Sequence, residues 1–347
     1  TFSETVVAGS GNILISTGSS SDGGFESIPV GNAKVSISSN VVTINPAGTF
    51  ASSTAYNVQV PSTAFDDAAG NSYAGITNAT TLNFTAVDVV APTVTSVTSS
   101  TGNGTKKVGD VIAITITFSE NVTVSGTPQL TLETGSTDAV VNFSSGSGGT
   151  TLTFNYTIAS GHVSSDLDYK ATSSLALNSG TIRDGAGNNA TLTLASPGAS
   201  NSLGVNKALV VDGVLPTLSS SSPADGATSI GVNANIVLTF SETVVAGSGN
   251  ILISTGSSSD GGFESIPVGN AKVSISSNVV TINPAGTFAS STAYNVQVPA
   301  TAFDDAAGNS YAGITNATTL NFTSADVVAP TMTITATDGS SAVSDGA

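Results

Sequence analysis

Acidic and amide residues recur at matching places in this sequence and are the residues best suited to chemistry. Each of three Thr-Phe-Ser-Glu segments ends in a glutamate, and an Asp-x-Ala-Gly-Asn segment follows each one at a nearly constant distance. The glutamates are Glu4, Glu120 and Glu242, and the later segments are residues 67–71, 184–188 and 305–309. Carboxylate and amide oxygens are the ligands that a hard cation such as Ca²⁺ prefers. Cation binding is therefore the first chemistry to consider.

A third recurring segment, Asp-x-x-x-Pro, begins at Asp88, Asp212 and Asp326. If the first strand of a domain runs down from this linker and the second runs back, the glutamate that ends the second strand returns to the linker aspartate. By the same counting of alternating strands, the Asp-x-Ala-Gly-Asn loop should lie at that end too. Three carboxylates and an amide oxygen would then converge, and like charges repel unless a cation bridges them.

We therefore predict calcium as the cofactor, bound at two sites. The predicted ligands are Asp88, Glu120, Asp184 and Asn188 at the first site, and Asp212, Glu242, Asp305 and Asn309, with Asp304, at the second. The alternative is that Asp and Asn serve only the turn chemistry that they share with Gly. Turn chemistry does not explain the strand-end glutamate or the linker aspartate, and so calcium is favoured.

Catalytic chemistry finds little support. His162 is the only histidine, it lies in a Ser-Gly-His-Val turn, and a hydrolytic triad requires defined partner geometry. Asp166 and Asp168 could form a carboxylate pair of the kind that glycoside hydrolysis needs, but the chain has no Trp to provide a sugar platform. We predict no catalytic residues and no enzyme activity.

The composition excludes several classes of partner. Seven basic residues against 23 acidic ones give a formal net charge of −16, which disfavours binding to nucleic acid or an anionic membrane surface. The chain has no Cys, so neither disulfides nor thiolate metal sites can stabilise it. No run approaches the roughly 18 apolar residues of a membrane span. A structural calcium ion is the remaining means of cross-linking.

The sequence repeats itself almost without change. Residues 1–85 reappear as residues 239–323, and the two copies differ only by Ser62 against Ala300. A divergent copy lies between them, because residues 117–120 and 184–188 repeat the same motifs. The expected domains are residues 1–91, which lack their first strand, 92–215, 216–329 and the start of a fourth at 330–347. Either the chain is a window of a longer array, which we favour, or the missing strand is donated by the C-terminal segment of another chain.

The hydrophobic pattern predicts strands throughout. Residues 151–158 alternate with period two, and residues 34–37 and 41–44 flank a polar Ser-Ser-Asn turn. No segment has a helical period. About seven short strands in each domain of roughly 100 to 125 residues predict an all-β fold of tandem Greek-key sandwiches of the immunoglobulin-like type, arranged end to end.

The Phe-Ser-Glu strand end, the Asp-x-Ala-Gly-Asn loop and the Asp-x-x-x-Pro-Thr linker resemble the bacterial Ig-like repeats of giant secreted adhesins and S-layer-type surface proteins. Residues 216–227 are similar to the S-layer-type repeat, and residues 165–169 and 180–184 are similar to repeats of calcium-associated adhesins. This resemblance covers essentially the whole chain.

The resemblance implies a non-catalytic structural segment, an extender or fibre at the bacterial cell surface, whose partners are neighbouring repeats and copies of itself in a fibre or layer. The alternative that it leaves open is an adhesin module that binds a glycan or a host receptor. Adhesin, S-layer and filament all remain possible parents.

Overall fold

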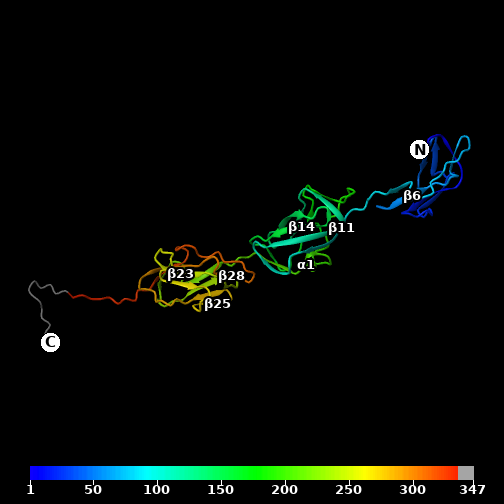
Figure 1. Cartoon of the computed structure of the whole chain (residues 1–347). Coiled ribbons are helices and arrows are strands. Elements are labelled where there is room, and N and C mark those ends of the chain that lie inside the picture. Colours follow the sequence, from blue (N-terminus) through cyan, green and yellow to red (C-terminus); the bar gives the residue numbers. More distant parts are fainter. Residues whose placement is uncertain (335–347) are drawn as a thin grey trace, which may run out of the picture.

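The computed structural model describes residues 1–334 and consists of three β-rich modules that follow one another in a line (Figure 1). Module 1 comprises strands β1–β8, module 2 strands β9–β18 and module 3 strands β19–β29. Each module has its own hydrophobic core. The predicted all-β fold of tandem Ig-like sandwiches is confirmed. The predicted fourth domain falls mostly on residues 335–347, which lie outside the described part of the chain.

Module 2 is a sandwich built around one long strand. Its strands are β9 (Val94–Ser99), β10 (Gly104–Lys107), β11 (Val111–Ser125), β12 (Gln129–Leu132), β13 (Ala139–Ser145), β14 (Gly149–Thr157), β15 (Val163–Ser164), β16 (Leu175–Ala176), β17 (Thr181–Arg183) and β18 (Leu209–Asp212). One sheet has the order β16-β12-β13-β14-β11-β17, with β9 also on β11, and the other has the order β10-β18-β15. Every second residue of β11 from Ile112 to Phe118 is buried, as the period-two pattern requires.

The first half of β11 pairs with β14, and the second half pairs with β17. The register with β14 shifts between Thr117 and Val122, which is where the strand leaves one set of neighbours for the other. Glu120 lies in this irregular stretch. The single helix of residues 1–334, α1 (Leu203–Asn206), has four residues and begins after Ser202, whose side chain accepts a hydrogen bond from the Val205 N–H. No helix in this range could cross a membrane.

Module 3 contains the same kind of sandwich. Its strands are β19 (Leu218–Ser222), β20 (Ala227–Ile230), β21 (Ile236–Phe240), β22 (Val245–Ala246), β23 (Asn250–Thr255), β24 (Glu264–Pro267), β25 (Val273–Ser276), β26 (Val279–Ile282), β27 (Ala293–Gln297), β28 (Phe303–Asp304) and β29 (Asn321–Ser324). A sheet of order β19-β21-β26-β25 packs on one of order β20-β29-β27-β23-β24, and β22 pairs with β28.

Module 1 repeats all of this pattern except its first three strands. Its strands are β1 (Val6–Ala8), β2 (Asn12–Thr17), β3 (Glu26–Pro29), β4 (Val35–Ser38), β5 (Val41–Ile44), β6 (Ala55–Gln59), β7 (Phe65–Asp67) and β8 (Asn83–Thr85). In module 3, strands β19 and β21 cover the hairpin of β25 and β26. Thr1 is equivalent to Thr239, and among the described residues the matching hairpin β4-β5 forms a sheet of two strands.

This difference gives identical residues different environments. Val280 and Ile282 are fully buried in module 3, whereas Val42 and Ile44, their counterparts in module 1, are partly exposed. Replacing Ile282 with Ala should lower the free energy of unfolding of module 3 by about 2–5 kcal/mol, because it removes apolar contacts and leaves a cavity. Differential scanning calorimetry of the variant against wild type checks this, and an unchanged transition of module 3 would contradict it.

Candidate metal centres at the joints

Two clusters of three carboxylates lie where the modules meet. Asp88, Glu120 and Asp184 form the cluster at joint 1, which we define as residues 86–93, between modules 1 and 2. In this cluster each residue offers one carboxylate oxygen, and these oxygens all lie within 4.8 Å of one another. Asp212, Glu242 and Asp305 form the equivalent cluster at joint 2, residues 213–217, under the same distance limit. The structure thus brings together the carboxylates predicted for each site, with the exception of Asp304.

Each cluster draws on three separate parts of the chain. Asp88 follows β8 of module 1 and Asp212 ends β18 of module 2, so both belong to the preceding module or its linker. The glutamate comes from the next module, where Glu120 lies in β11 and Glu242 lies two residues after β21. The third carboxylate directly follows β17 or β28. A cation held here would therefore connect an incoming linker to the body of the following module.

The Asp-x-Ala-Gly-Asn loop is a tight turn that its own aspartate organises. Asp184 Oδ1 accepts hydrogen bonds from the backbone N–H groups of Ala186 (2.9 Å) and Asn188 (2.8 Å). Gly187 has φ +97°, a left-handed conformation that favours glycine at this position. In module 3, Asp305 Oδ1 likewise accepts a bond of 2.8 Å from the Asn309 N–H.

The asparagine of the loop joins it to the linker. Asn188 Nδ2 donates to Asp184 Oδ2 (2.7 Å) and to the backbone carbonyl of Asp88 (3.1 Å). Asn309 Nδ2 donates to Asp305 Oδ2 (2.8 Å) and to the carbonyl of Asp212 (2.9 Å). We expected these amide oxygens to face the cation, but it is the amide nitrogens that face the cluster. In this arrangement the asparagines hold the linker in place.

Asp304 lies outside the cluster of joint 2. Its Oδ1 accepts a hydrogen bond of 2.5 Å from the Ser310 hydroxyl, and its backbone pairs with Val245 in the β22-β28 ladder. The side chain of Asp304 is thus engaged on the neighbouring face of its strand.

The Asp-x-Ala-Gly-Asn loop of module 1 forms the same turn. Asp67 Oδ1 accepts bonds from the N–H groups of Ala69 (2.9 Å) and Asn71 (2.7 Å), as in the other two loops. Glu4 and Asp67 are not part of any three-carboxylate group found within residues 1–334. The turn therefore forms through its own hydrogen bonds, and turn chemistry accounts for the loop aspartate but not for the glutamate beside it.

In each cluster, the glutamate is the carboxyl group whose ionised form is least favoured. Burial, reinforced by the negative charges of Asp88 and Asp184, raises the pKa of Glu120 above its usual value. Burial, together with the charges of Asp305 and Asp212, raises the pKa of Glu242 in the same way. In addition, Glu242 Oε1 is buried and has no hydrogen-bond partner within the described residues. Such a group favours a proton or a cation.

Two aspartates of the first cluster are held ionised. The Ser52 hydroxyl, 2.7 Å from Asp88 Oδ1, and the Val90 N–H lower the pKa of Asp88. At Asp184 partial burial acts to raise the pKa, but hydrogen bonds from the side chain and backbone of Asn188 outweigh it, so that the pKa falls. Joint 1 thus combines two stabilised carboxylates with one that resists ionisation, a set that a divalent cation would neutralise.

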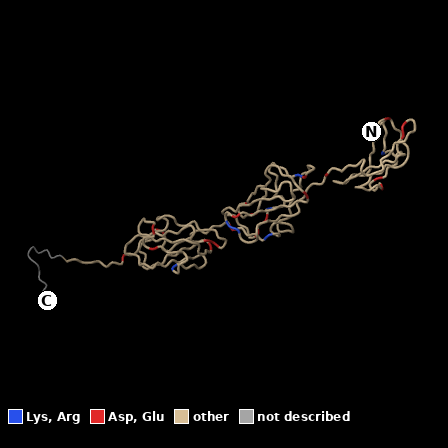
Figure 2. The backbone as a smooth tube through the Cα atoms, viewed as in Figure 1, with Lys and Arg blue, Asp and Glu red and all other residues tan. Residues whose placement is uncertain are grey.

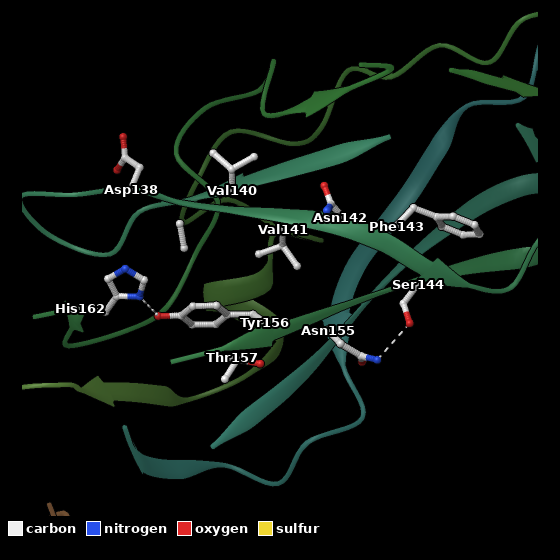
Figure 3. Close-up of a pocket in the computed structure, with 11 residues that line it drawn as sticks. Asp138, Val140, Val141, Asn142, Phe143, Ser144, Asn155, Tyr156, Thr157 and His162 are labelled. Carbon is white, nitrogen blue, oxygen red and sulfur yellow. Dashed lines mark hydrogen bonds between the residues drawn. The ribbon is translucent and has the colours of Figure 1, made fainter. Parts of the chain in front are cut away.

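The other candidate residues have structural partners. The His162 ring stacks on Tyr156 with the ring centroids 5.8 Å apart, and its Nδ1 lies 2.9 Å from the Tyr156 hydroxyl (Figure 3). Burial raises the pKa of Tyr156 to about 12. Asp168 accepts hydrogen bonds from the N–H groups of Tyr169 and Gly198, both at 2.9–3.0 Å. These contacts fix loops and assemble no triad.

The contacts that cross joint 2 were not anticipated from the sequence. Lys107 Nζ donates to the carbonyl of Gly308 (2.8 Å), and the Val108 N–H donates to Asn309 Oδ1 (2.9 Å). The one available signal is compositional, because residues 106 and 107 are the only adjacent pair among the seven basic residues.

The bacterial Ig-like domain family model matches residues 1–86, 88–197 and 212–324. Among solved structures, "I-band fragment I67-I69 from titin" is 11% identical, covers 94% of this chain and 98% of its own, and has a TM-score of 0.33. "Chimeric titin Z1Z2 functionalized with a KLER exogenous peptide from decorin" is 12% identical, covers 69% of this chain and 98% of its own, and has a TM-score of 0.21. No curated protein matches the chain.

The raised pKa of the glutamates predicts an unusual pH dependence in the absence of calcium. Above the usual Glu value of 4.5, the folded state holds a proton that the unfolded state has released, so stability should fall as the pH rises through the raised pKa of Glu120 and Glu242. The lowered pKa values of Asp88 and Asp184 matter in a different pH range. The stability that these ionised groups contribute should be lost as the pH falls below 3.8.

Thermal melting in chelator over a pH series measures this dependence. Glu242→Gln should abolish the fall in the melting transition of module 3, and Glu4→Gln, in the equivalent position outside a cluster, should leave it intact. A fall of the same size in wild type and Glu242→Gln would contradict the assignment.

Proposed function

This chain belongs to the bacterial Ig-like domain family, and we propose that it is a non-catalytic extender of a bacterial cell-surface or extracellular protein, stiffened by calcium at its joints. Domains of this family are structural modules of extracellular surface proteins, and tandem copies suggest a structural or adhesin-like segment. Partners under this proposal are the neighbouring repeats and further copies of the chain in a fibre or layer.

The observation that carries the proposal is the convergence at each joint of a linker carboxylate with two carboxylates of the next module. Hydrogen bonds within the turn explain only one of the three. At neutral pH the cluster has no basic side chain in ion pairing with it, since the ion pairs of residues 1–334 are Lys34–Glu26, Lys170–Asp138 and Lys272–Glu264. A bound Ca²⁺ would supply the missing positive charge and the missing partner of Glu242.

A calcium ion that binds only the folded joint stabilises it by RT ln(1 + [L]/Kd), which is about 2.7 kcal/mol when free calcium is a hundredfold above Kd. The gain applies to the module that supplies the glutamate and the loop, because unfolding that module disperses the ligands. The same ion would restrict rotation of the linker, since it would bond to the linker aspartate as well.

The line of modules suits a spacer (Figure 1). The alternative, a module that binds a glycan or receptor, has less support from the surface. The hollow of module 2 in Figure 3 is lined by a mixture of polar groups, such as Asn142 and Asn155, and small apolar groups, such as Val140. Tyr156 at its floor is only 2% exposed and cannot stack on a sugar ring. Binding of the chain to a glycan array would favour this alternative.

Calcium should raise the melting temperatures of modules 2 and 3, and chelator should lower them. Glu120→Gln should remove the response of module 2, Glu242→Gln should remove that of module 3, and Glu4→Gln should change neither. Calorimetry with calcium and with chelator tests this. If chelator leaves wild type unchanged, or if Glu120→Gln and Glu242→Gln keep the full response, the clusters are not calcium sites.

An extender should also be a rod in solution. In calcium, small-angle X-ray scattering should give a cross-section of one module and a maximum dimension close to three modules placed end to end. A compact particle, in which the modules fold back on one another, would contradict the extender.

A further inference from the structure

We infer that the two joints are mechanically unequal: joint 2 is fixed by direct bonds between its modules, whereas joint 1 is a hinge that needs its ion to hold a direction. The role of the ion rests on the proposed function. The difference between the joints rests on contacts that involve no ion.

The linker of joint 2 is part of a sheet until it reaches module 3. Strand β18 lies between β10 and β15, and its last residue, Asp212, pairs with Lys107 on one side and Val163 on the other. Gly213 continues this anchoring, because its N–H donates to the His162 carbonyl (2.7 Å) and its carbonyl accepts from the Gly161 N–H (2.8 Å). The residue that supplies the carboxylate is therefore immobile relative to module 2.

The body of module 2 also bonds to the body of module 3. The end of β10 and the residue after it provide both contacts, from Lys107 Nζ to the Gly308 carbonyl and from the Val108 N–H to Asn309 Oδ1. Asn309 is only 3% exposed, so its bonds are shielded from water. Figure 2 shows basic residues at the end of module 2 that faces module 3. These bonds fix the orientation of two rigid bodies without any cation.

Joint 1 lacks both features. Strand β8 ends at Thr85, and the linker then attaches to module 1 through the Ala86 N–H, the Asp88 carboxylate and the Val89 N–H, the last two at the Ser52 hydroxyl. Val87, Val89 and Val90 are 77%, 67% and 56% exposed. The hydrogen bonds of Asn188 reach the linker at Asp88 and Val90. In residues 1–334, no hydrogen bond joins the body of module 1 to the body of module 2.

Without an ion, joint 1 is therefore held only by a mostly exposed linker and its hydrogen bonds to Ser52 and Asn188, against the mutual repulsion of three carboxylates. An ion would reverse that repulsion and pin Asp88 to Glu120 and Asp184. At joint 2 the same ion would add stability, but it would not change the relative orientation of modules 2 and 3, which their direct bonds already fix. Calcium would thus control direction at joint 1 alone.

The end of module 3 repeats the features of joint 1. Asp326 to Pro330 has the same sequence as Asp88 to Pro92. Asp326 Oδ1 accepts a bond from the Ser290 hydroxyl (2.9 Å), as Asp88 does from Ser52. The same linker sequence and the same anchoring bond therefore follow both modules of the near-identical pair.

Single-molecule FRET can compare the joints with matched labels, because the chain has no native Cys. Ser36→Cys with Val140→Cys spans joint 1, and Val140→Cys with Ser274→Cys spans joint 2. Ser36 and Ser274 are equivalent exposed positions in the two near-identical modules. In chelator the distance distribution across joint 1 should be about twofold broader than across joint 2, because no hydrogen bond among the described residues joins the bodies of modules 1 and 2 across the exposed linker. Calcium should narrow the distance distribution across joint 1 and leave that across joint 2 unchanged.

Lys107→Met tests the cause. It removes the bond to Gly308 and should broaden joint 2 in chelator, whereas Lys106→Met, which removes the same charge from the adjacent position, should not. Unchanged circular dichroism and melting of module 2 would show that both variants are folded.

Equal widths across the two joints in chelator would overturn the inference, whatever calcium does. If the distance distribution is broad across joint 1 and narrow across joint 2, and calcium changes neither, the difference between the joints is upheld and the calcium proposal is overturned instead. If the distance distribution across joint 2 stays narrow in Lys107→Met, the rigidity comes from the anchored linker and the Val108–Asn309 bond, and the role given to Lys107 is overturned.

Discussion

The structure of both joints depends on one constraint: three carboxylates lie close together at the point where one sandwich ends and the next begins. A linker of a few residues, stiffened by proline, brings an aspartate to the end of the following module. In module 2, strand β11 passes from one set of neighbours to another at this same end, and Glu120 lies there; in module 3, Glu242 lies just after β21. The loop and its asparagine then close around the incoming chain. Repulsion among these groups makes the joint the part of the molecule most sensitive to its ionic surroundings.

The fold could be predicted because it follows from local patterns. Alternation in residues such as Ile112, Ile114 and Ile116 identifies one buried face, and the near-perfect repeat identifies the unit. The convergence of Asp88 with Glu120 and Asp184 could also be predicted, because antiparallel strands alternate in direction and the ends of every second connection meet. Counting strands needs no knowledge of side-chain geometry.

The remainder depends on tertiary contacts that leave no local trace. The orientation of the Asn188 and Asn309 amides is set by the linker carbonyls, which the sequence does not place. Lys107 contacts Gly308 only because β10 pairs in parallel with β18, and no periodic pattern in the sequence indicates that pairing. Val42 and Val280 have the same neighbours in sequence yet differ in burial, since that depends on strands from elsewhere.

The placement of a divergent module between two nearly identical ones has a consequence for biosynthesis. When adjacent domains share their sequence, strands of one can enter the sheet of the other while the chain emerges, and misassembly of this kind is a characteristic failure of repeat proteins. Here residues 1–85 and 239–323 are interchangeable in sequence, but module 2 separates them. By the time the second copy is made, the first has had an entire domain's synthesis time in which to bury its edges. Separating the two near-identical copies by module 2 therefore disfavours strand exchange between them during synthesis.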